Sequence, residues 1–105
     1  MAKEQTIPEA ALRDPNAVEM LRVWIAERSL WCSLRVGMHK SRGLDEPWAW
    51  GVTLADAARH IASALASSEG ADPSELLQKI RDSFSVELDK PTSGTVGRFV
   101  DMKRD

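Results

Sequence analysis

The sequence is poor in the residues that most often mark chemistry, with one cysteine and two histidines among 105 residues. The lone Cys32 excludes an intramolecular disulfide, and without a CxxC partner it predicts neither a zinc site nor a redox pair. No apolar run approaches the roughly 18 residues of a membrane-spanning helix. Residues 1–14 lack the apolar stretch of a secretory signal, so we expect a soluble, cytoplasmic protein without membrane contact.

Recognisable catalytic and ligand-binding motifs are also missing. No serine lies in a GxSxG turn and no glycines form a phosphate-binding pattern, so phosphoryl transfer and nucleotide binding lack support. His39 and His60 are not spaced like metal ligands, and Asp45 and Glu46 do not complete a cluster with them. We therefore expect no metal, no cofactor and no conventional active site.

The charges are mixed in sign and spread along the chain. Fourteen basic and 16 acidic residues give a net charge of −2. A nucleic-acid-binding protein usually gathers its lysines and arginines into one patch, and this chain does not. We therefore do not expect nucleic acid as the partner.

Two β-branched and aromatic segments, Val18–Ala26 and Leu30–Met38, predict an antiparallel hairpin. A turn at Glu27 and Arg28 would set the register, although a longer or bulged loop through Ser29 is an open alternative because Glu-Arg is poor chemistry for a tight turn. On one face this register pairs Leu21 with Leu34, Val23 with Cys32 and Ile25 with Leu30; on the other it pairs Trp24 with Trp31, Arg22 with Ser33 and Met20 with Arg35.

Three further elements are expected after the hairpin. Trp48–Val52 alternates large and small residues and predicts a short third strand that pairs with the second. Thr53 to Asp56 has the form of a capping box and predicts a helix that ends near Gly70, and Asp72-Pro73 predicts a second helix to about Leu88. The apolar stripes of these helices are Leu54, Ala57, Ala58, Ile61 and Leu65, then Leu76, Leu77, Ile80, Phe84 and Leu88.

These elements define an α+β fold class: a three-stranded antiparallel meander followed by two amphipathic helices on one face, with a possible short C-terminal edge strand at Thr95–Val100. The expected division is a flexible leader over residues 1–16, one α+β domain over residues 17–90, and a tail over residues 91–105 that forms a short strand and is then disordered.

Three segments of the chain resemble a family of short bacterial proteins, about 100 residues long, of unknown function. They are Asp14–Ala26, Trp50–Ala62, and Ile80–Phe84 together with Pro91-Thr92. The resemblance implies a discrete single domain and brings no activity, cofactor or catalytic residue with it.

The functional hypothesis depends on where the tryptophans lie. Two helices cover one face of a three-stranded sheet, so Trp24 and Trp31 would be left on the other face. We call this surface the tryptophan face, and its members are Met20, Arg22, Trp24, Trp31, Ser33 and Arg35. Exposed indoles favour a partner that covers them, and a homodimer with central aromatics and a rim of arginines is the leading hypothesis. The open alternatives are the tail folding back through Val96, Phe99 and Val100, and a small-molecule or peptide groove.

A second hypothesis comes from another class of protein. Arg59 and His60 lie in the first predicted helix, and a small cofactor-free enzyme or anion-binding protein could use His60 as a base, with Arg59 or Arg35 to hold the anion. A third reading, single-stranded nucleic acid stacked on the tryptophans, is the weakest because the chain is acidic.

Overall fold

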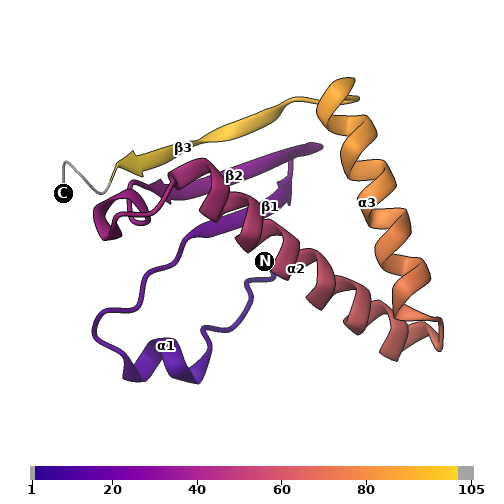
Figure 1. Ribbon diagram of the computed structural model, residues 1–105, viewed down its shortest axis with the longest axis horizontal. Helices are drawn as coiled ribbons and strands as arrows, with labels where there is room; N and C mark the ends of the chain where they lie inside the picture. The colour runs from indigo at the N-terminus through magenta and orange to yellow at the C-terminus, as the bar shows by residue number, and fades with distance from the viewer. Residues whose placement is uncertain (1, 102–105) are drawn as a thin grey trace.

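The computed structural model describes residues 2–101, which form an α+β fold with a three-stranded sheet in the order β1-β2-β3 (Figure 1). The fold class predicted from the sequence is confirmed at this level, including the C-terminal edge strand. The elements in chain order are α1 (Glu9–Arg13), β1 (Leu21–Ala26), β2 (Ser29–Val36), the short helix η1 (Lys40–Arg42), α2 (Glu46–Glu69), α3 (Pro73–Asp89) and β3 (Thr95–Asp101).

The predicted hairpin register is confirmed residue for residue, from Leu21 opposite Leu34 to Ile25 opposite Leu30. Its turn consists of Glu27 and Arg28 alone, with φ angles of 49° and 63°. Positive φ at both central residues is the geometry of a type I′ turn, which suits the twist of the strands but strains residues other than glycine and asparagine. The strong pattern of the two strands therefore sets the register despite unfavourable turn residues.

The prediction of a third strand at Trp48–Val52 is wrong, because these residues form the first turns of α2. Asp45 caps the helix: its carboxylate accepts a hydrogen bond from the Trp48 amide at 3.1 Å. Pro47 lies in the first turn, where its missing amide hydrogen costs nothing. A five-residue alternation fits a helix as readily as a strand, and the cap decides between them.

The predicted capping box at Thr53 is also wrong, because Thr53 lies inside α2. Its hydroxyl donates to the carbonyl of Ala49 at 3.0 Å, which is how a threonine within a helix commonly satisfies itself. The start of the second predicted helix is confirmed, since the Asp72 carboxylate accepts from the Ser74 amide at 3.0 Å and Pro73 is the first residue of α3.

The third strand of the sheet is β3, which pairs in parallel with β2. The sheet is therefore mixed and not a meander, and α2 and α3 make the long connection that a parallel pair requires. β3 lies very close to β2 at Gly97, where a Cβ atom would come within 1.8 Å of the Cys32 carbonyl oxygen. The disorder predicted for residues 102–105 lies outside the described residues, and the division into leader, domain and tail stays a prediction.

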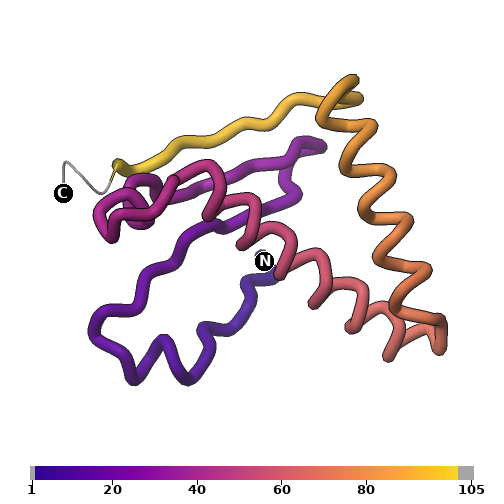
Figure 2. The backbone as a smooth tube through the Cα atoms, viewed as in Figure 1, coloured from indigo at the N-terminus to yellow at the C-terminus, as the bar shows by residue number. Residues whose placement is uncertain are grey.

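The helices pack on each other over only part of their length. Figures 1 and 2 show α2 and α3 diverging from the loop that joins them, so that α2, α3 and the sheet form three sides of an open triangle. Among residues 2–101, Ala62 is the only hydrophobic residue that is fully buried. Half-buried Leu76, Leu77 and Ile80 of α3 accompany it.

The chain therefore exposes far more surface than a compact protein of its size. Its accessible surface is 8993 Å², whereas a folded monomer of 11.6 kDa has about 5,800 Å². Its radius of gyration is 15.7 Å, against about 13 Å for a compact chain of this length. The roughly 3,000 Å² of excess surface is the main physical feature of this fold.

Candidate interaction surfaces

The structure assembles the tryptophan face on one side of the sheet, where Trp24 lies directly opposite Trp31. Trp24 is half-buried, whereas Trp31 is 37% exposed and its indole N–H donates to the carbonyl of Ala26 at 2.9 Å. Met20, Arg22 and Arg35 are half-buried and Ser33 is exposed. On β3 the register adds Val96 beside Trp31, Arg98 beside Ser33 and Val100 beside Arg35.

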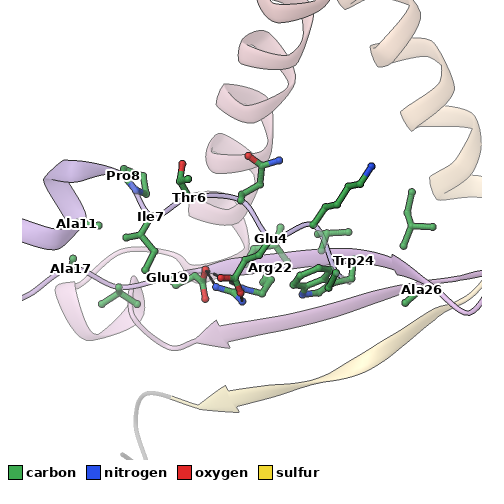
Figure 3. Close-up of a pocket in the computed structure, with 17 residues that line it drawn as sticks. Glu4, Thr6, Ile7, Pro8, Ala11, Ala17, Glu19, Arg22, Trp24 and Ala26 are labelled. Carbon is green, nitrogen blue, oxygen red and sulfur yellow. Dashed lines mark hydrogen bonds and ion pairs between the residues drawn. The ribbon is translucent and has the colours of Figure 1, made fainter.

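The N-terminal segment partly covers this face. Residues 2–8 run along β1 and enclose with it an open groove of about 1100 Å³ (Figure 3). Arg22 anchors the segment, because its guanidinium donates to the Glu4 carboxylate at 2.7 Å and to that of Glu19 at 3.0 Å. Hydrogen bonds to Glu19 and then Glu4 raise the pKa of Arg22. Residues 95–101 do not play this covering role, because they form β3 and widen the sheet.

The opposite side of the sheet is the aliphatic face, whose hairpin members are Leu21, Val23, Ile25, Leu30, Cys32 and Leu34, with Phe99 added by β3. Leu21 and Leu34 are half-buried at the end of the sheet from which the chain leads into α2. At the other end Ile25 is 85% exposed. Phe99, which lies beside Leu34 on the edge strand, is also open to solvent. An aliphatic side chain as large as Ile25 is therefore left with almost no packing.

A third apolar surface lies on the helices. We call it the helical wedge, and it consists of Leu54, Ile61 and Leu65 on α2 with Phe84 and Leu88 on α3; all five are exposed. On α2 the three members flank the side of the helix that carries buried Ala62. On α3 the two members continue the stripe of Leu77 and Ile80 beyond the point where the helices separate. The predicted stripes are present on both helices, but neither is covered along its whole length.

The connection between β2 and α2 is organised by Glu46. Its carboxylate accepts from the Lys40 amide at 2.8 Å, the Gly37 amide at 2.9 Å and the Trp50 indole at 3.0 Å. Partial burial pushes the pKa of Glu46 upward, but the amide and indole donors, together with nearby His39, overcome it and hold the pKa below its usual value. The His39 ring meets Trp50 edge-on with the ring centres 6.1 Å apart.

Glu46 and His39 are the residues whose role the sequence-based reasoning missed. Their spacing in the sequence bears only on metal ligation, and no group of three potential ligands forms within residues 2–101. The signal that could have revealed Glu46 is its place between a capping aspartate and a proline, a pair that also opens α3 as Asp72-Pro73 but without a residue between them. The Nε2 atom of His39 is buried and has no hydrogen-bond partner among the described residues.

The residues of the enzymatic hypothesis do not form an enclosed site. Arg59 and His60 are exposed on α2, and the Arg59 guanidinium pairs with Asp56 one turn earlier. Arg35 lies on β2, a different element, and is half-buried. What the structure does gather is apolar side chains, on three surfaces that no part of residues 2–101 covers completely.

This architecture and these surfaces define a small α+β domain whose hydrophobic core is only partly covered. The chain belongs to the family described as Domain of unknown function (DUF5076), whose profile matches residues 4–92. That match ends before β3 begins, so the family profile spans the hairpin and both long helices but not the edge strand.

A solved structure has a similar fold over nearly the whole chain. It is from the photosynthetic bacterium Rhodopseudomonas palustrus CGA009 and is described, on a provisional basis, as a pyruvate dehydrogenase. The two chains share 29% identity with a TM-score of 0.68, over 90% of this chain and 91% of that one. No curated protein matches the chain. Within residues 2–101, no helix has the length and apolar character needed to cross a bilayer.

Proposed function

We propose that this protein is a noncatalytic interaction module that self-associates. The observation that carries the proposal is the roughly 3,000 Å² of surface beyond that of a compact monomer. Interfaces of obligate dimers remove about 1,000 to 2,500 Å² from each chain, so a permanent partner would cover much of the excess. Much of it is contributed by large apolar side chains, which is the composition of such interfaces.

The tryptophan face is the surface that the sequence assigns to this contact, and that assignment stays a prediction. In its favour, the exposed indole of Trp31 lies beside Val96 on the neighbouring strand, and arginines border the patch. Against a large contact here, residues 2–8 already run along β1, and the salt bridge of Glu4 to Arg22 holds them there. The aliphatic face and the helical wedge offer the larger uncovered apolar surface.

Multi-angle light scattering at micromolar concentration tests the proposal. We expect the mass of two chains or a multiple of it for the wild type, and a lower mass or weaker association for Trp31→Ala if the tryptophan face takes part. A wild-type chain that is folded and strictly monomeric under these conditions would remove the proposal. Equal association of Trp31→Ala and the wild type would retain self-association and exclude this face from the contact.

The dehydrogenase description belongs to the similar structure, and no observation on residues 2–101 extends it to this chain. The same holds for the hypothesis that His60 acts as a base, since its side chain lies in solvent and not in a cavity. A histidine titration by NMR separates this class from the proposal. A metabolite that moves the His60 resonance at micromolar concentration would favour a ligand-binding function.

A further inference from the structure

We infer that a second copy of this chain binds to the helical wedge. The inference rests on the proposed self-association and names the surface that carries it. At the wedge two elements begin a core and then leave it open: α2 and α3 are in contact near their connecting loop and diverge toward the sheet (Figure 1).

The α3 helix supplies the first argument. Its apolar stripe runs along the helix from Leu76 to Leu88, and most of its charged residues lie on the other side, although helical spacing places Glu87 within the stripe. The first half of the stripe is half-buried against α2, whereas Phe84 is 48% exposed and Leu88 is more exposed still. Isolated helices of this length are marginal in water, so the second half needs a packing partner to stay folded.

The α2 helix supplies the second argument. The side that faces α3 carries small residues, with Ala62 fully buried and Ala58 and Ala66 half-buried. The larger side chains Ile61 and Leu65 lie next to this alanine stripe and stay exposed. The small side chains let α3 approach α2 closely. The larger side chains beside them then form an apolar surface on which a further helix can pack.

The shape and chemistry of the wedge favour a second copy over other occupants. Its members bring no polar group that would orient a small ligand. Helices α2 and α3 form a V with an apolar surface on each helix. Such a shape is self-complementary under twofold symmetry, because one helix of each chain can lie between the two helices of the other chain. The missing core contacts are needed whenever the chain is folded, and obligate homodimers often have no stable folded monomer.

The amount of surface agrees with this arrangement. The roughly 3,000 Å² excess is large enough to include an obligate interface. The wedge, together with the open end of the aliphatic face where Ile25 lies, would form the apolar centre of that interface. The tryptophan face is on the other side of the sheet and would stay accessible in such a dimer.

Two aspartate substitutions on α3 form a matched test. Phe84 belongs to the wedge, whereas Val86, which is 62% exposed, points to the opposite side of the helix. Each change places a carboxylate at an exposed apolar position two residues from the other. We expect Phe84→Asp to weaken association about a thousandfold, since a central interface side chain is worth about thirtyfold and a twofold interface contains it twice. Val86→Asp should associate like the wild type.

Sedimentation equilibrium of the three full-length chains measures the outcome. Association of Phe84→Asp equal to that of Val86→Asp, with a dimeric wild type, overturns the wedge and leaves self-association standing. A monomeric, folded wild type overturns both. Because Phe84→Asp can fail to fold, isotope-filtered NOE spectra of mixed labelled and unlabelled wild-type dimers give an independent readout. Contacts between chains from the Phe84 ring to Ile61 or Leu65 support the wedge, and interchain contacts confined to the tryptophan face exclude it.

Discussion

The thermal stability of this protein should depend on its concentration. A chain with one fully buried hydrophobic residue among residues 2–101 has too little core to be stable alone, so unfolding and dissociation should occur together. For two chains of 105 residues, the enthalpy of unfolding near 60 °C is about 150 kcal/mol at about 0.7 kcal/mol per residue. The midpoint temperature Tm should then rise by about 3 to 4 °C for each tenfold increase in protein concentration.

The four tryptophans make this measurement possible at low concentration. Intrinsic fluorescence would follow unfolding over a hundredfold range of concentration, with circular dichroism at the upper end and a check that each transition is reversible. We expect Tm to change by about 7 °C across that range. A constant Tm with a cooperative transition would mean that the monomer is stable by itself, and the reasoning from exposed surface would be refuted.

Three further predictions concern single positions. Gly97→Ala should lower the free energy of unfolding by about 2 kcal/mol or more, because its Cβ would overlap the Cys32 carbonyl, whereas Gly94→Ala, with open space around it, should change it by less than about 0.5 kcal/mol in the same urea titration. Arg28→Gly should raise the free energy of unfolding by about 1 kcal/mol by relieving a φ of 63°, and a lower urea midpoint would contradict the turn assignment. Glu46 has a lowered pKa in the folded state, so its contribution is complete above its ordinary value of 4.5 and is lost as the pH falls through the folded value. Thermal melts between neutral and acidic pH should therefore show a steeper acid loss for the wild type than for Glu46→Gln, and parallel curves would exclude this role.

The hairpin was the most predictable part of the fold. Its two strands carry an alternation in which every one-residue slip would move Leu21, Val23 and Ile25 to the other face, so only one register keeps like residues together. The sequence therefore predicted the pairing although Glu27 and Arg28 are poor turn formers. The start of α3 was predictable for a similar reason, because Asp72 and Pro73 each satisfy a separate requirement of a helix terminus.

The segment from Asp45 to Thr53 shows where such reasoning fails. Its alternation of tryptophan with small residues is too short to separate a strand from a helix, and the decision belongs to contacts outside the segment. The Glu46 carboxylate accepts hydrogen bonds from the backbone amides of residues 37 and 40, which lie before the helix. It also accepts one from the Trp50 indole, one turn later in the helix. A carboxylate that joins two elements in this way cannot be recognised from local periodicity. The parallel pairing of β3 was unpredictable for the same reason, since it depends on where two long helices deliver the chain.

The candidate surfaces were predicted in composition but only partly in place. The sequence correctly put Trp24 opposite Trp31 and grouped the helical stripes, but it assumed that both stripes pack on the sheet. In the structure α3 packs on α2 and stands away from the strands, so Phe84 and Leu88 are left open (Figure 1). The angle between two helices depends on side chains at their contact and on the loop that joins them, which a stripe does not encode.

The two sides of the sheet differ in chemistry, and the difference bears on how each would be used. The aliphatic face and the helical wedge carry leucine, isoleucine and phenylalanine, which resemble the interior of a domain and suit a contact that never opens. The tryptophan face carries arginines beside its aromatics, and Arg22 already holds the Glu4 carboxylate at 2.7 Å in its own chain. Arg22 is half-buried but Glu4 is exposed, so the salt bridge should cost little to break, and an acidic segment of a partner could replace residues 2–8 on Arg22 and Trp24. A module built in this way would use one side of the sheet to complete its fold and keep the other side, under a displaceable N-terminal segment, for a second and reversible contact.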